Sequence, residues 1–133
     1  EAAGVGGQVT YVGELDREAK QVFLRGLDVF SVPSVYEEPK GLSILEAMAC
    51  GVPCVQPDHG IFAEMCGPGR GSVLCDPHDT DALAEALADV LLDLPKARGL
   101  GEKARQQVLS HHQMDAMAQA TVAAVEDIGR GQL

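Results

Sequence analysis

The sequence has few basic residues and lacks a long apolar run. Ten Lys and Arg stand against twenty Asp and Glu, so the formal net charge is −10. The basic residues are scattered, which argues against nucleic acid or an anionic membrane surface as a partner. No apolar run approaches the ~18 residues of a membrane-spanning helix, and no signal peptide opens the chain. We therefore expect a soluble, cytoplasmic protein without a transmembrane segment.

Cysteine pairs typical of zinc sites are also absent. The four cysteines, Cys50, Cys54, Cys66 and Cys75, form no Cys-x-x-Cys motif. Their spacing favours buried, reduced thiols, and we expect no metal site and no cofactor. The triplet 79–81 (DTD) has the form of a metal-binding Asp-x-Asp motif, but its position at a helix start favours helix capping.

The remaining pattern is an alternation of strands and helices. Apolar residues make up 46% of the 133 residues, which suits one globular domain or part of one. The predicted strands are 8–12, 28–32, 52–56 and 72–75, and the predicted helices are 16–26, 42–50, 61–66, 80–94, 96–110 and 114–128. We treat 1–133 as a single partial domain, in which 114–133 form a C-terminal helix and tail, frayed from 129 onward.

Short connections between such elements imply a parallel, doubly wound α/β sheet. Sheets of this kind bind ligands at the carboxyl ends of their strands, beside helix N-termini. The segments 13–16, 33–41 and 57–62 all fall at that edge, which makes them the first candidates for a site.

The stretch 38–57 (EPKGLSILEAMACGVPCVQP) carries the most chemistry. Pro39 favours an extended Glu38, and Gly41 and Leu42 would present free N–H groups suited to phosphate at the helix start. Glu46 lies among apolar residues, so we expect a buried helix and a carboxylate that needs partners. The pair of glutamates suits a ligand with hydroxyls and phosphates. The alternative is that Glu46 caps loop amides and Glu38 is only solvated.

Residues 33–55 (PSVYEEPKGLSILEAMACGVPCV) resemble the donor-binding signature of the group 1, or family 4, glycosyltransferases of the GT-B fold. Glu38 and Glu46 match its Glu-x7-Glu spacing, and 46–55 match the run that follows except at Cys54. The resemblance extends to the segments 9–13, 28–34 and 76–87 and covers some 75 to 85 residues. It implies a Rossmann-like parallel sheet, part of the GT-B C-terminal domain, with helices on both faces and a helical C-terminus.

The resemblance also implies roles for individual residues. Glu38 would be catalytic, contacting hydroxyls of the transferred sugar, and Glu46 would hold the ribose hydroxyls. The implied donor-binding set is Glu46, Lys40, Gly41, Leu42, Ser43, Gly13, Leu15, His59 and Gly60. The ligand would be a UDP-, GDP- or ADP-sugar, and transfer would retain anomeric configuration without a required metal.

Two residues depart from the family pattern. Lys40 takes the place of a common Phe, and either adds charge beside the diphosphate or points to solvent. His59 replaces the first glycine of a common Gly-Gly pair, and either touches the donor sugar or is a solvated loop histidine.

Compared with that family, the N-terminal acceptor domain and the first two strands of the donor domain are missing from the sequence. The piece alone would then be inactive or nearly so, and the missing domain could make the enzyme peripheral to a membrane. The strand 8–12 would be unpaired, repositioned or paired with a second copy of the chain. Two other functions stay open: a non-catalytic binding or assembly module, and a sugar-nucleotide epimerase or phosphorylase on the same fold.

Overall fold

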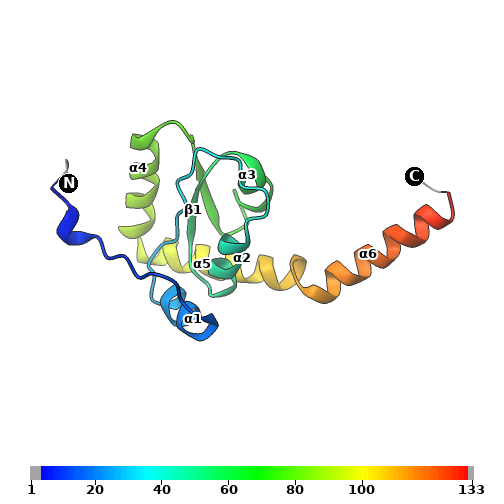
Figure 1. The fold of residues 1–133 in the computed structure, drawn as a ribbon. Coiled ribbons are helices and arrows are strands. Elements are labelled where there is room, and N and C mark those ends of the chain that lie inside the picture. The colour runs from blue at the N-terminus through cyan, green and yellow to red at the C-terminus, as the bar shows by residue number, and fades with distance from the viewer. Residues whose placement is uncertain (1–3, 132–133) are drawn as a thin grey trace.

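Two short parallel strands lie at the centre of the computed structural model, which describes residues 4–131. Strand β1 (Cys54–Pro57) pairs with β2 (Ser72–Cys75), with Cys54 opposite Ser72 and Pro57 opposite Cys75. The helices are α1 (Arg17–Arg25), α2 (Leu42–Ala49), α3 (Gly60–Met65), α4 (Thr80–Leu91), α5 (Leu94–His111) and α6 (Met114–Gly129), preceded by a 3₁₀ turn, η1 (Gly6–Gln8). The predicted class, a parallel α/β sheet with a helical C-terminus, is confirmed (Figure 1).

The predicted strand 28–32 is reduced to one bridge, between Phe30 and Cys54. The amide of Phe30 donates to the carbonyl of Pro53 at 2.9 Å, and the amide of Val55 donates to the carbonyl of Phe30 at 3.0 Å. In a regular parallel ladder the amide of Val32 would next donate to the carbonyl of Val55, and the nitrogen of residue 57 would donate to the carbonyl of Val32, but residue 57 is proline and carries no hydrogen. The backbone ladder therefore cannot continue toward Val32 in the regular way.

The side chain of Gln56 binds the backbone of this segment instead. Its Oε1 accepts from the amide of Val32 at 3.0 Å, and its Nε2 donates to the carbonyl of Phe30 at 3.3 Å. Gln56 is fully buried, so unpaired polar atoms there would be costly, and these two bonds satisfy them. A side chain thus holds the segment that leads into residues 33–41.

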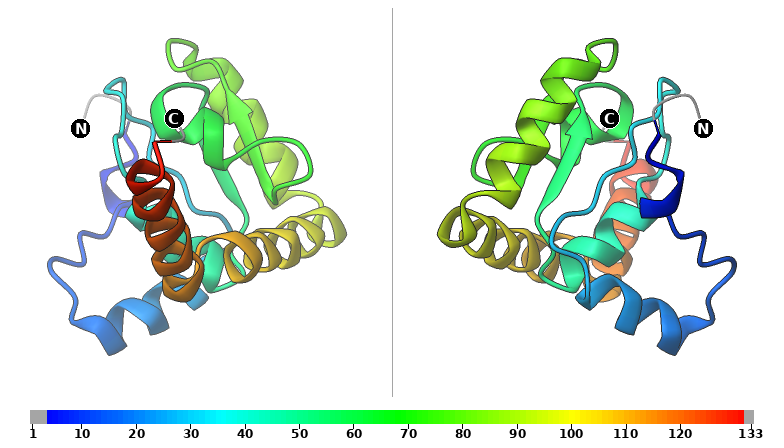
Figure 2. Two further views of the ribbon diagram at one scale, coloured as in Figure 1. Left: turned by 90° about the vertical axis from the view of Figure 1, so that its right-hand side faces the viewer. Right: turned by 90° about the vertical axis from the view of Figure 1, so that its left-hand side faces the viewer.

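The predicted strand 8–12 has no strand partner among residues 4–131. Val9 is 72% exposed and Tyr11 is 92% exposed, and η1 occupies residues 6–8. Both views of Figure 2 show this segment running along the outside of the molecule, away from β1 and β2. Of the three arrangements considered above, the structure has the unpaired one, and pairing with a second copy stays a prediction.

Aspartates begin three of the helices. Asp16 Oδ1 accepts from the amide of Ala19 at 2.8 Å and caps α1. Asp79 Oδ1 accepts from the amides of Asp81 and Ala82, both at 2.9 Å, so the capping role predicted for the triplet 79–81 is confirmed. Asp93 caps α5 in the same way, which ends the predicted helix 80–94 early. Leu94, the last residue of that predicted helix, begins α5 instead and is 62% exposed.

The core lies between the strands and helices α2, α3 and α5. Its buried members are Leu24, Ile44, Ala47, Met48, Val52, Cys54, Phe62, Met65, Cys66 and Ala104. Helix α5 packs on α2, β1 and β2, and α1 contributes one buried side chain, Leu24. Arg105 of α5 also donates to the carbonyl of Ala49 at the end of α2, at 2.6 Å. Helix α2 is thus held firmly from the α5 side.

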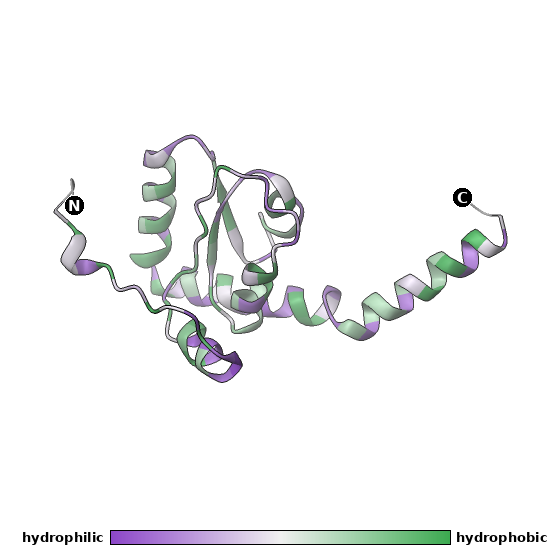
Figure 3. Cartoon of the chain, in the orientation of Figure 1, coloured by the Kyte–Doolittle hydropathy of each residue, from purple (hydrophilic) through white to green (hydrophobic). Residues whose placement is uncertain are grey.

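Helix α6 lies outside this core. Every residue from 111 to 131 is exposed, and Figure 1 shows α6 projecting away from the rest of the molecule. Hydrophobic residues recur along its length in Figure 3, among them Met117, Val125 and Ile128. The predicted helix 114–128 is confirmed, and it includes Gly129 of the predicted frayed tail; 132–133 lie outside the described residues. Within residues 4–131, no helix is both long and apolar enough to cross a membrane.

Candidate functional site

Glu38 closes a tight turn immediately before α2. Its Oε1 accepts from the amides of Lys40 and Gly41, both at 3.0 Å. These two hydrogen bonds, the one from Gly41 first, lower the pKa of the Glu38 carboxyl below its usual value. The prediction that the Gly41 amide is free for a phosphate is therefore wrong in this structure, because Glu38 itself accepts from it. It is also Glu38, and not Glu46, that caps loop amides.

Backbone conformation and packing explain why residue 41 is glycine, without reference to a ligand. It begins α2 with φ +63°, in the left-handed region that disfavours side chains. A Cβ here would lie 3.0 Å from Met65 Sδ and 3.2 Å from Ile61 Cγ2. The close approach at Gly41 is thus to Ile61 and Met65 of α3, so the start of α2 packs tightly against α3.

Residues 59–61 hold the backbone of Glu38 from the other side. The amide of Ile61 donates to the carbonyl of Glu38 at 3.1 Å. A Cβ on Gly60, whose φ is +53°, would lie 3.0 Å from the amide nitrogen of Glu38. His59 Nε2 is 2.8 Å from the carbonyl oxygen of Ser34, so the loop 33–41 is also held at its beginning. His59 is therefore not a freely solvated loop histidine.

The structure thus brings together the predicted residues on both sides of this turn, which are Glu38, Lys40, Gly41, His59 and Gly60. The His59 ring also contacts Phe62, with ring centroids 6.0 Å apart, while its Nδ1 is buried and has no hydrogen-bond partner within residues 4–131. The Lys40 side chain is exposed. We call residues 34–41, together with their contacts to residues 59–61, the Glu38 turn.

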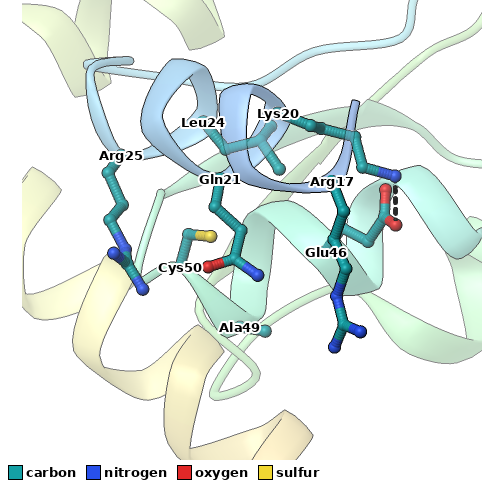
Figure 4. A pocket seen from close by; sticks show the side chains of 8 residues that line it. All are labelled: Arg17, Lys20, Gln21, Leu24, Arg25, Glu46, Ala49 and Cys50. Atoms are coloured by element: carbon teal, nitrogen blue, oxygen red, sulfur yellow. Dashed lines mark hydrogen bonds and ion pairs between the residues drawn. The ribbon is translucent and has the colours of Figure 1, made fainter. Parts of the chain in front are cut away.

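Glu46 lies on a different side of α2, in a pocket of about 300 Å³ between α1 and α2 (Figure 4). Lys20 Nζ is 2.6 Å from Glu46 Oε1, and the two side chains are 41% and 46% exposed. The prediction that α2 is buried on all sides is wrong. Ile44, Ala47 and Met48 have no exposed surface, but Leu42 is 63% exposed, because α2 packs on the core along one face only.

Sequence reasoning missed the basic residues of this α1–α2 pocket. Its lining is Arg17, Lys20, Gln21, Leu24, Arg25, Glu46, Ala49 and Cys50. Arg17, Gln21 and Arg25 stand four residues apart and extend from one side of α1 in Figure 4. That spacing was visible in the sequence, but nothing local indicates that this side of α1 faces α2.

The other predicted residues are not part of either region. Gly13 has no atom within 4 Å of its Cβ position, and neither Gly13 nor Leu15 lines the α1–α2 pocket. Leu42 borders a separate hollow of about 450 Å³ between α2 and the start of α6. Ser43 is exposed on the first turn of α2. Their predicted donor contacts stay predictions.

The cysteines behave as separate thiols. All four are free, Cys54 and Cys66 are buried, and Cys50 and Cys75 are partly exposed. Burial raises the pKa of the Cys54 and Cys66 thiols, because it penalises the thiolate. In the part of the chain that the structure describes, no group of three or more His, Cys, Asp or Glu is arranged to hold a metal ion.

The two strands run parallel, and a helix follows each of them at its carboxyl end, so the chain belongs to the open parallel α/β class of folds. Within that class, the chain belongs to the family of glycosyl transferases group 1, whose profile matches residues 1–107. The family membership predicted from the Glu-x7-Glu signature is confirmed.

Three known proteins illustrate the relationship. The glycogen synthase of Mycobacterium tuberculosis is 35% identical over 122 residues, which are 92% of this chain and 29% of that protein. The structure of sucrose-phosphate synthase from Thermosynechococcus elongatus matches with TM-score 0.87 and 33% identity over 98% of this chain and 32% of that one. Anabaena HepE, solved with UDP and glucose, has the same fold, with TM-score 0.80 and 22% identity over 95% of this chain and 34% of that one. The chain thus spans about a third of each of these proteins.

Proposed function

We propose that this chain is the donor-binding part of a retaining glycosyltransferase that takes its sugar from a nucleotide-sugar. The observation that carries the proposal is the pair of glutamates, Glu38 and Glu46, that lie before and within α2 with the family spacing. The resemblance to HepE, which was solved with UDP and glucose, supports a nucleotide-linked sugar as the ligand. The remainder of the enzyme would supply the acceptor side.

Each glutamate has the chemistry that its proposed role requires. Carboxylates accept hydrogen bonds from sugar hydroxyls, and charge-assisted bonds of this kind are stronger than neutral ones. Glu46, partly exposed in the α1–α2 pocket, would accept from the ribose hydroxyls. Glu38 uses Oε1 for the turn, which leaves Oε2 for a hydroxyl of the transferred sugar.

The phosphates would lie near the first turn of α2. The first intrahelical bond runs from the amide of Leu45 to the carbonyl of Gly41, so the amides of Leu42 and Ser43 precede it. Such amides favour an anion, and they would stabilise the charge that develops on the leaving diphosphate. The base would lie toward Gly13 and Leu15, and the reaction would need no metal.

A titration of the chain with UDP, GDP and ADP, followed by amide NMR, tests the proposal. We expect shifts within 38–46 and 58–61 and a preference for one nucleotide. Glu46→Ala should weaken binding of that nucleotide by about 1.5–3 kcal/mol, the usual range for a hydrogen bond to a charged group. Glu85→Ala, which removes an exposed carboxylate from α4, is the matched control and should bind like the parent.

Two results would contradict the proposal. One is the absence of nucleotide-dependent shifts at millimolar concentration. The other is a Glu46→Ala variant that binds as tightly as the parent, since the carboxylate would then have no part in the ligand site.

A further inference from the structure

The contact between Lys20 and Glu46 differs from the other ion pairs in the described part of the chain. It joins two helices that are 26 residues apart in sequence, at 2.6 Å, and both partners line the α1–α2 pocket. The remaining pairs link Lys96 with Asp89, and Arg130 with Glu126 and Asp127, on more exposed surfaces. Exposed pairs of that kind contribute little to stability.

The geometry of the pair leaves one oxygen of the Glu46 carboxylate available for another hydrogen bond. The contact uses Oε1, and no residue within 4–131 donates a hydrogen bond to Oε2. A partly exposed glutamate without a partner can rotate about its side-chain bonds, and ordering it on binding costs entropy. Lys20 removes part of that freedom beforehand, because it holds Oε1 while Oε2 keeps no protein donor within residues 4–131.

The surroundings of the pair also matter for an anionic ligand. The whole chain carries a formal charge of −10, yet the pocket lining contains three basic residues, Arg17, Lys20 and Arg25, against Glu46 alone. Figure 4 shows Lys20 directed at Glu46 while Arg17 and Arg25 extend beside the pocket. A phosphorylated ligand that approaches Glu46 therefore meets a locally positive surface.

We propose that Lys20 is a positioning residue of the ligand site, which orients Glu46 so that its second carboxylate oxygen can accept from a ligand hydroxyl. This inference rests on the proposed function, because it concerns the carboxylate that would hold the nucleotide ribose. It adds α1 to the site, since Lys20 reaches Glu46 only when α1 is docked on α2.

The test compares dissociation constants of the nucleotide that gives the largest NMR shifts, measured by calorimetry on the same chain. Lys20→Met keeps the apolar stem but removes the ammonium, and should raise Kd about three- to fivefold. Lys20→Arg keeps a charged donor and should recover binding to within about twofold of the parent. Lys96→Met removes a lysine of similar exposure from a pair outside the pocket, and is the matched control.

A double-mutant cycle separates positioning from general electrostatics. In a Glu46→Gln background, the additional change Lys20→Met should leave Kd within about 1.5-fold, because the carboxylate that Lys20 positions is already gone. If Lys20→Met weakened binding equally in both backgrounds, Lys20 would act as an independent charge, and the positioning role would be wrong. Thermal unfolding of each variant checks that α1 remains folded.

The remaining outcomes also decide the matter. If Lys20→Met bound the nucleotide as tightly as the parent while Glu46→Ala weakened binding, this inference would be wrong and the proposed function would stand. Tighter binding would mean that Lys20 competes with the ligand for Glu46, which also overturns it. Absence of binding in the parent chain would contradict the proposed function, and this inference with it.

Discussion

Glu38 and Glu46 lie at opposite ends of one nine-residue stretch, but contacts of different range hold them. Glu38 accepts from amides two and three residues away, and its backbone is held by residues 59–61. Glu46 depends on one side chain from α1, 26 residues earlier in the chain. The Glu38 turn is therefore held by hydrogen bonds to backbone groups, while the Glu46 side depends on how α1 docks. We expect the two sides to fail separately.

The largest effect should come from the α1 side. Leu24 is the buried residue of α1, with 5% of its surface exposed, and Leu24→Ala should lower the free energy of unfolding by about 2.5–4 kcal/mol. Loss of this anchor should release Lys20 from Glu46 but leave the Lys40 and Gly41 amide resonances in place. Denaturant unfolding and amide NMR measure the two effects.

The matched control for that prediction is Val22→Ala. Val22 lies on the same helix and is 71% exposed, so its loss should change stability by less than about 0.5 kcal/mol. Shifts of Lys40 and Gly41 in Leu24→Ala as large as those around Glu46 would show that the two sides are coupled and do not fail separately.

A somewhat smaller effect should come from the Glu38 side. Gly60→Ala combines an unfavourable left-handed φ with contacts of 3.0–3.2 Å to the backbone of residues 37 and 38. We expect a loss of about 1.5–3 kcal/mol in stability and displaced resonances for 37–41, with the Lys20–Glu46 pair intact. Thermal unfolding and NMR provide the measurements.

Gly99→Ala is the corresponding control, because Gly99 lies within α5 and its Cβ would meet no atom within 4 Å. Alanine is the better helix former, so this change should stabilise the chain by up to about 1 kcal/mol. A Gly60→Ala variant as stable as Gly99→Ala would show that the loop 33–41 is not held by residues 59–61.

The smallest effect should be the pH dependence of the Glu38 turn. Hydrogen bonds from the Gly41 and Lys40 amides lower the pKa of Glu38 in the folded chain. Their contribution to stability is therefore complete above the pKa of glutamate in the unfolded chain, and it is lost as pH falls through the lower, folded value. The Lys40 and Gly41 amide resonances should titrate at a pH below the usual range for glutamate, and Glu38→Gln should abolish that titration.

Features that depend on local sequence were predicted well. The cap at Asp79, the strand 72–75 and the helix 114–128 follow from short-range patterns, and the structure contains each of them. The neighbourhood of Glu38, Gly41 and Gly60 followed from the expectation that loops after parallel strands gather at one edge of the sheet.

Features that depend on which helices and strands pack against each other were predicted poorly. An apolar composition suggested that α2 is buried on all sides, whereas only the face with Ile44, Ala47 and Met48 packs on the core. Likewise, the segment 28–32 reads as a strand, but its pairing depends on the partner strand, where Pro57 has no hydrogen to donate and the Gln56 side chain bonds to the backbone of Phe30 and Val32.

The sequence by itself determined the family, through the spacing of Glu38 and Glu46, and the positions of the helices and of the two strands β1 and β2, because capping and periodicity act between near neighbours. The tertiary structure decided what each glutamate contacts. Glu38 uses amides that are always close to it in the chain, but its turn is fixed by residues 59–61. Glu46 contacts Lys20 only because α1 and α2 pack together, and contacts between distant residues depend on the packing of the whole chain.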